Sequence, residues 1–198
     1  ARPKPLLHHD PKTAEAYYEH PRRELLPAIP LAAKRVLDVG CGAGALGRVL
    51  KEERNVEEVC GIEFIEEAYQ RARTTLDRVL HGNIEEMDLP WDNEYFDCIV
   101  CADVLEHLVD PSAVMAKLSR VLAPRGVIVI SVPNIRFHEV LHMLSNGAWT
   151  YYEQGIMDAT HLRFFTRSGL RTMIENGGME AVEIIPLNQR PPSFLPKN

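Results

Sequence analysis

A carboxylate followed by three alternating glycines is the stretch of this sequence best suited to chemistry. Asp38 lies in the short apolar run at residues 36–39, and Gly40, Gly42 and Gly44 follow at every second position before an alanine- and leucine-rich run. Glycine permits a tight turn and leaves no Cβ between backbone and ligand, and the first N–H groups of a following helix can face that ligand. The pattern predicts a nucleotide-type cofactor loop between a strand and a helix.

Two kinds of cofactor fit such a loop. The spacing Gly40-x-Gly42-x-x-Ala45 matches the dinucleotide fingerprint, and Glu63 could hold a ribose, which would make the protein an NAD-dependent oxidoreductase. Asp38 argues against that interpretation, because a carboxylate beside a pyrophosphate repels it. Beside a ligand that carries an ammonium and a sulfonium, the same carboxylate attracts. The charge at this position therefore favours a cationic methyl donor.

Histidines are the side chains best suited to move a proton near neutral pH. His161 is the candidate general base for a hydroxyl acceptor, and the alternative is that it and Thr160 only anchor the loop before a helix. His107 is either a structural histidine or an acceptor contact. His138 and His142 would share one helix face but have no acidic partner in register, so no metal site is predicted.

These residues must be positioned by alternating strands and helices. Asp110-Pro111 is typical of a helix start, and Gly177-Gly178 of a helix end. The apolar patterns predict a helical region at 12–29 that is broken at Pro21, and further helices at 43–53, at 65–80, from 111 and from 166. They predict strands at 34–39, 56–64, around 81, at 95–103, at 127–132 and at 179–185. Such alternation predicts an α/β fold, a Rossmann-like doubly wound, mostly parallel sheet with helices on both faces and a ligand at the carboxyl ends of the strands.

Composition limits the partners. The 198 residues fit one domain, and the net charge of −6, without a run of five like charges, argues against nucleic acid or anionic membranes. No apolar stretch reaches 18 residues, so no membrane span is expected, and no signal peptide is recognised. Cys98 and Cys101 would point to opposite faces of one strand. All four cysteines are expected to be small buried thiols in a reducing cytoplasm.

The segment Asp38-Val39-Gly40-Cys41-Gly42-Ala43-Gly44 resembles the DxGxGxG loop of class I S-adenosylmethionine-dependent methyltransferases. The resemblance implies S-adenosylmethionine as the cofactor and S-adenosylhomocysteine as the product. It places Glu63 on the ribose hydroxyls, Phe64 on the adenine, and Asn83 where the family often has Asp for the adenine amine. The cofactor contacts implied by this resemblance are Asp38, Gly40, Cys41, Gly42, Gly44, Glu63, Phe64, Asn83, Ile84, Ala102, Asp103 and Val104.

The second half of the chain narrows the resemblance. The segment at 158–166 is similar to the "D-x-THLRFFT" motif of a bacterial subgroup near the ubiquinone O-methyltransferases, and the resemblance covers about residues 15 to 187. It implies one domain over 1–198 with an N-terminal helical lid at 1–34, a cofactor-binding core at 35–133, an acceptor-side insert at 134–165, and a helix, strand and tail at 166–198. The expected acceptor contacts are Tyr17, Tyr18, His107, Asn134, His138, Tyr151 and Arg163.

The expected activity is methyl transfer from S-adenosylmethionine to a small-molecule acceptor, with a hydroxyl first and an amine or carboxylate next. The alternatives are a methyltransferase acting on a peptide or RNA, the NAD-dependent oxidoreductase, and a non-catalytic module that binds the donor. A monomer or homodimer is expected. The family sheet usually ends in a seventh, antiparallel strand, and the proline-rich segment at 188–198 has no strand pattern. The seventh strand is therefore expected to be absent from this chain.

Overall fold

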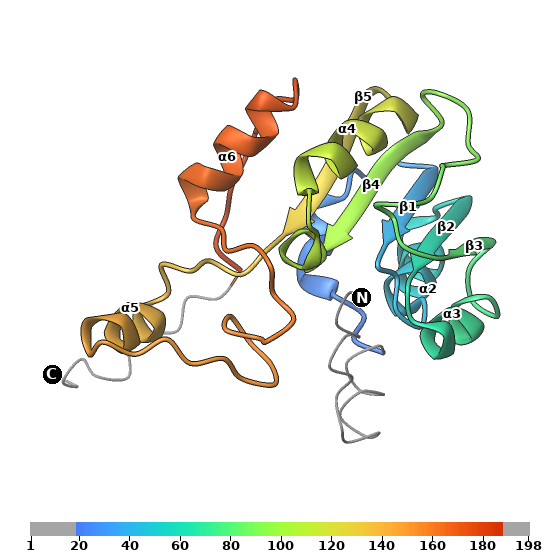
Figure 1. The fold of residues 1–198 in the computed structure, drawn as a ribbon. Helices are drawn as coiled ribbons and strands as arrows, with labels where there is room; N and C mark the ends of the chain where they lie inside the picture. The colour runs from blue at the N-terminus through green and yellow to red at the C-terminus, as the bar shows by residue number, and fades with distance from the viewer. Residues whose placement is uncertain (1–18, 188–198) are drawn as a thin grey trace, which may run out of the picture.

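The computed structural model describes residues 19–187, which form a parallel sheet with helices on both faces (Figure 1). The five strands are β1 (Arg35–Val39), β2 (Glu58–Glu63), β3 (Arg78–His81), β4 (Phe96–Ala102) and β5 (Leu122–Ser131). Their order is β3-β2-β1-β4-β5, and every neighbouring pair is parallel. The doubly wound fold predicted from the sequence is confirmed.

Two helices pack on each face of the sheet. The helices are α2 (Ala45–Arg54), α3 (Glu66–Ala72), α4 (Pro111–Val121), α5 (His138–Ser145) and α6 (Arg167–Asn176), with short 3-10 turns η1 (Arg23–Ala28) and η2 (Leu105–His107). One apolar core lies between the sheet and α2, α3 and η1, and a second lies between the sheet and α4 and α6. Successive residues of a strand enter opposite cores, which is why β1 and β4 are buried along most of their length and carry mainly apolar residues.

Helix starts follow the local chemistry that the sequence indicated. The Asp110 carboxylate accepts the N–H of Ala113 at 3.0 Å, with Pro111 in the first turn of α4. The Thr166 hydroxyl accepts the N–H of Gly169 at 3.0 Å and starts α6. Within residues 19–187, no helix is both long and apolar enough to cross a bilayer.

The helix predicted at 65–80 is wrong in its second half. Helix α3 ends at Ala72, and the chain enters β3 at Arg78. Asp77 explains the break, because its N–H donates to the carbonyl of Val59 at 3.0 Å and its carboxylate accepts the Val59 N–H at 2.8 Å. These two bonds tie the segment to β2, so the chain pairs with the sheet instead of continuing the helix. The predicted third strand around His81 is confirmed.

The sixth strand predicted at 179–185 is also wrong, because that described segment forms no strand. Ala181 is buried and Met179 packs against the core, but Val182 and Ile185 are 86 % and 52 % exposed. The carbonyl of Ala181 accepts from the Arg171 side chain at 3.0 Å instead of from a neighbouring strand. Apolar alternation makes a strand only when a sheet edge is in reach. Of the helical region predicted at 12–29, the structure describes residues 19–29, which hold the 3-10 turn η1 and no α-helix, and residues 12–18 lie outside the described part.

Candidate functional site

The site lies where the strand order reverses, between the carboxyl ends of β1 and β4. Helix α2 follows β1 on one face of the sheet and α4 follows β4 on the other, so the two connections diverge and leave a crevice. The glycine loop after β1 closes one side of this crevice and the segment Ala102–Leu108 closes the other. They approach closely, because a Cβ on Gly40 would stand 2.7 Å from Cγ2 of Val104.

The glycine loop needs its glycines. Gly40, Gly42 and Gly44 have φ angles of 72°, 55° and 83°, in the left-handed region that side chains disfavour. The N–H of Gly40 donates to the carbonyl of Ile62 at 2.8 Å, and the N–H of Gly42 donates to the Glu63 carboxylate at 2.8 Å. The loop is therefore tied to the end of β2, and Gly44 starts α2.

Two buried carboxylates face this loop. Asp38 is 3 % exposed and Glu63 is 6 % exposed. The carboxylate of Glu63 accepts the N–H groups of Gly42 and Ile65, both at 2.8 Å. The carboxylate of Asp38 accepts no hydrogen bond from any residue within 19–187. Burial, reinforced by the charge of Glu63, raises the pKa of Asp38 to about 7, and burial also raises the pKa of Glu63. A cationic ligand relieves both effects, so these residues fit a sulfonium cofactor.

The ends of β2 and β3 offer a surface for a flat ring. Phe64 is 52 % exposed and lines a hollow together with Gly82, and Ile84 is buried. The amide oxygen of Asn83 accepts the N–H of Glu85 at 3.0 Å. One lone pair of this oxygen is thus engaged in a turn, which leaves one for the adenine amine that the sequence analysis assigned to it.

Asp103, expected to hold the donor, belongs to a polar network across the cleft. It has a φ of 54°, and its carboxylate accepts from Arg22 at 2.6 Å and from the hydroxyl of Ser131 at 2.8 Å. Arg22 also donates to Ser131 at 3.0 Å. Arg22 and Ser131 were not singled out in the sequence, since only the fold brings them to this strand end.

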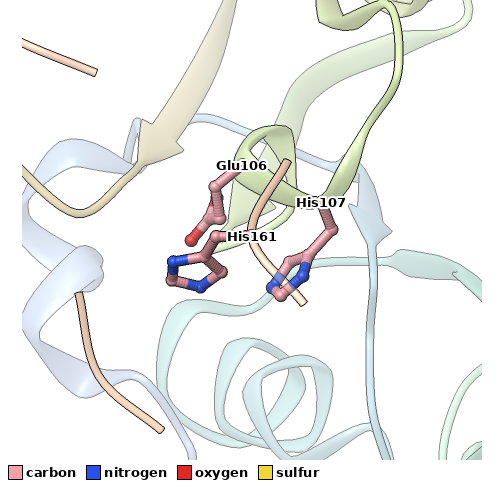
Figure 2. A group of neighbouring side chains, drawn as sticks. All are labelled: Glu106, His107 and His161. Carbon is pink, nitrogen blue, oxygen red and sulfur yellow. The ribbon is translucent and has the colours of Figure 1, made fainter. Parts of the chain in front are cut away.

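A second cluster lies deeper in the acceptor side of the cleft. Figure 2 shows Glu106 and His107, from η2, converging with His161, from the loop before α6. One ligand atom from each residue lies within 4.8 Å of the others. The carbonyl of Glu106 accepts the N–H groups of Leu162 and Arg163, at 2.7 and 3.0 Å, which fixes the His161 loop against η2.

The hydrogen bonds define the protonated nitrogens of both rings. The Nδ1 of His161 is 3.0 Å from the carbonyl of Ile156, and a carbonyl only accepts, so Nδ1 carries the proton. The Thr160 hydroxyl donates to Asp158 at 2.6 Å and therefore accepts from Nδ1 of His107 at 3.1 Å. Burial and the neighbouring His161 lower the pKa of His107. In the neutral rings, Nε2 of each histidine is the free acceptor.

The structure brings most of the expected site residues into one cleft, which Asp38, the loop, Glu63 and His161 line together. Gly44, Tyr151 and Arg163 do not line it. Arg163 instead donates to the carbonyls of Val109 and Leu162. Tyr17 and Tyr18 lie outside the described residues. The expected residues that line the cleft are Asp38, Gly40, Cys41, Gly42, Glu63, Phe64, Asn83, Ile84, Ala102, Asp103, Val104, His107, Asn134, His138 and His161.

The cysteines play no evident part in this chemistry. All four are free and buried, and Cys98 and Cys101 enter opposite cores as expected. Burial raises the pKa of Cys60 and of Cys98 to about 12 and that of Cys41 further. Thiols in this state are poor nucleophiles.

The fold and the site define an α/β protein of the class that binds S-adenosylmethionine, and comparison with known proteins agrees. A family model described as a methyltransferase domain matches residues 9–184. The chain therefore belongs to this methyltransferase domain family, and it is an S-adenosylmethionine-dependent methyltransferase whose product from the donor is S-adenosylhomocysteine.

Relatives and solved structures are consistent with that assignment. The chain is 28% identical over 169 residues to a ubiquinone biosynthesis O-methyltransferase of Coxiella burnetii, covering 82% of this chain and 70% of the relative. It is 30% identical over 172 residues to a Psychrobacter arcticus protein of the same name, covering 81% and 65%. A SAM-dependent methyltransferase from Aquifex aeolicus has the same fold, with a TM-score of 0.61, 21% identity, and coverage of 86% and 89%.

Glu106 is a further cleft residue that the sequence analysis missed. It lies just after the strand predicted at 95–103, but nothing in its neighbourhood along the chain distinguished it from a solvated acid. Its burial depends on the loop that carries His161, which is distant in sequence. The signal that could have found it is the pair Glu106-His107 next to a cofactor strand, read together with His161.

Proposed function

We propose that this methyltransferase acts on a hydroxyl group of a small-molecule acceptor. The observation that carries the proposal is the cluster of Glu106, His107 and His161 in the same cleft as the cofactor loop, in which hydrogen bonds hold Nδ1 of both rings. A hydroxyl must lose its proton to become a good nucleophile near neutral pH, whereas a neutral amine attacks through a lone pair it already has.

S-adenosylmethionine supplies an electrophilic methyl group on a cationic sulfur. In the transfer, the acceptor O–H bond and the sulfur–methyl bond break, an oxygen–carbon bond forms, and sulfur keeps the electron pair of the bond it loses. An imidazole of the cluster of Glu106, His107 and His161 takes up the proton at Nε2 and later releases it to solvent. The contribution of the chain is to align acceptor and donor and to promote loss of this proton.

The donor contacts follow from the cleft. Asp38 and Glu63 attract the cationic end and the ribose, the glycine loop lets the ligand approach the backbone, and Phe64 packs on the adenine. Gly44 acts indirectly, by starting α2 behind the loop. In this proposal residues 35–133 form the cofactor-binding core, and residues 134–165 form the acceptor side.

An apolar acceptor fits the surface beyond the cluster. The ring of Phe164 lies 6.5 Å from that of His161, and Trp149 packs on Phe164 at 5.3 Å and on Tyr151 at 6.2 Å. Trp149 and Tyr151 are about half exposed. The relatives named ubiquinone biosynthesis O-methyltransferases support oxygen as the methylated atom.

Calorimetric titration with S-adenosylmethionine, S-adenosylhomocysteine and NAD is the first test, and we expect binding of the first two only. Formation of S-adenosylhomocysteine is then measured with matched acceptors that differ in one group: phenol, aniline and benzoic acid, each with and without an alkyl chain. We expect turnover with the alkyl phenol and a mass gain of one methylene on oxygen. Turnover with the aniline or the acid alone, or donor binding without turnover on any acceptor, would contradict the proposal.

A further inference from the structure

The cluster on the acceptor side has the composition of a metal centre. We propose that Glu106, His107 and His161 form a binding site for one divalent first-row transition-metal ion, held by the Glu106 carboxylate and by Nε2 of both histidines. The sequence analysis predicted no metal, because it considered only ligands close together along the chain. Here the fold joins two ligands of η2 to a third from a distant loop (Figure 2).

The first argument is the state of Glu106. Its side chain is 1 % exposed, and neither carboxylate oxygen has a hydrogen-bond partner among residues 19–187. A carboxyl group buried without any partner is costly, and native proteins normally satisfy such groups or use them to bind an ion. Its two histidine neighbours offer lone pairs and no proton at Nε2. A cation between the three groups satisfies all of them at once.

The second argument is how the rings are held. Histidines that bind metals almost always donate their other ring N–H to a carbonyl or a carboxylate, which fixes the tautomer and the orientation. His161 donates its Nδ1–H to the carbonyl of Ile156. His107 donates its Nδ1–H to the hydroxyl of Thr160, and this hydroxyl donates to the carboxylate of Asp158. Both histidines therefore have the supporting hydrogen bond that a metal ligand requires.

The third argument is distance. The three ligand atoms lie within 4.8 Å of one another. With metal–ligand bonds of about 2.1 Å, each atom must move inward by less than ~1 Å to coordinate one ion. Rotation of side chains about their own bonds covers such a shift, and the backbone bonds from Leu162 and Arg163 to Glu106 already hold the two segments together.

The ligand set indicates the kind of ion and its use. Two imidazoles with one carboxylate suit zinc, iron, cobalt or manganese, whereas magnesium and calcium prefer oxygen ligands. Three protein ligands leave positions open toward the cleft. This last step rests on the proposed function and replaces its base: with Nε2 of both histidines bound to the ion, the acceptor hydroxyl would also bind the ion, which would lower the pKa of the hydroxyl, and its proton would pass to solvent instead of to an imidazole.

The test is direct metal binding by the full chain, without donor or acceptor. The protein is treated with a chelator, dialysed and titrated with Co²⁺, whose visible absorption reports coordination, and then with Zn²⁺ in competition. We expect one Co²⁺ per chain, displaced by Zn²⁺. Glu106→Gln and His161→Asn are expected to weaken binding by at least ~100-fold, and Thr160→Val by about 10-fold, with Thr160→Ser close to wild type.

His142→Ala is the matched control, because it removes an exposed histidine of α5 that lies outside the cluster, and we expect unchanged binding. Circular dichroism and the melting temperature establish that each variant is folded, and Glu106→Gln keeps the shape of the buried side chain. No cobalt spectrum from the folded wild type, or a spectrum that Glu106→Gln and His161→Asn leave unchanged, would overturn the proposal. Metal binding without methyl transfer to hydroxyls would instead overturn the proposed function and leave the metal site standing.

Discussion

The donor side and the acceptor side of the cleft are built in different ways. On the donor side, Asp38 and Glu63 lie on adjacent parallel strands, and the glycine loop is tied to β2 by backbone bonds. On the acceptor side, Glu106 and His161 meet through loops that touch at the Leu162 N–H. Figure 1 shows the segment after β5, with α5, extending away from the sheet.

This contrast indicates that the two sides of the cleft serve different functions, donor binding on one side and acceptor selection on the other. A cofactor common to many enzymes is bound by strand ends and a loop with fixed φ angles, which place charges and N–H groups rigidly. The acceptor differs from enzyme to enzyme, and loops carried on the rigid sheet can vary without unfolding it. Substitutions on the donor side should therefore change donor affinity, and those on the acceptor side should change turnover while donor affinity stays constant.

The largest effect is expected for Gly42→Val on the donor side. A β-branched residue at a φ of 55° is strained, and Gly42 lines the cleft in which we propose that the donor binds. Calorimetry should show donor affinity reduced by more than ~100-fold. Gly147→Val is the control, since Gly147 has a φ of 74° and open space around its Cβ position but does not line the cleft. Equal donor affinity in the two variants would mean that the loop is not the donor site.

Asp38→Asn should have the next largest effect, because it removes a buried charge from the donor side. We expect donor affinity to fall by about 10- to 100-fold, from loss of attraction to the cationic ligand. Asp88→Asn, which removes an exposed charge outside the cleft, should leave affinity unchanged. A similar loss in both variants would indicate a general field effect and not a contact.

The same variant should change how stability depends on pH in the absence of ligand. The pKa of Asp38 is raised to about 7, so this group favours the folded state below its unfolded pKa and loses that contribution as pH rises through 7. Between pH 5 and pH 8 the wild type should therefore lose about 3 kcal/mol of unfolding free energy that Asp38→Asn keeps. Urea titrations at both pH values measure the difference, and parallel pH profiles would show that Asp38 titrates normally.

The same contrast explains what the sequence could predict. The glycine loop, Glu63 and the parallel sheet follow from short-range patterns, because left-handed turns need glycine and strands covered on both faces need apolar residues throughout. The strand predicted at 179–185 failed because strand formation depends on a partner edge that sequence alone does not supply. Glu106 was missed for a related reason, since its burial depends on a loop more than fifty residues away.

On the acceptor side, Thr160→Val should lower turnover and leave donor affinity unchanged. The hydroxyl of Thr160 positions His107, and without it the ring loses the bond that fixes its tautomer. We expect kcat to fall about 10-fold with little change in the KM for the donor, and Thr160→Ser should restore it. If Thr160→Val weakened donor binding as much as turnover, the two sides of the cleft would not be separable.

The smallest effect is expected for Arg22→Ala, at the boundary between the two sides. The partly exposed ion pair of Arg22 with Asp103 is worth about 1 kcal/mol or less, so the melting temperature should fall by only about 2–4 °C. Donor affinity should rise by about two- to fivefold, because a positive charge leaves the surroundings of Asp38, whose pKa Arg22 lowers. Arg22→Lys should show no such rise, and the gain should disappear at high salt, where charge effects are screened. A fall in donor affinity would instead mean that Arg22 contacts the donor directly. Asp103, which holds Arg22 by an ion pair, would then belong to the donor side of the cleft.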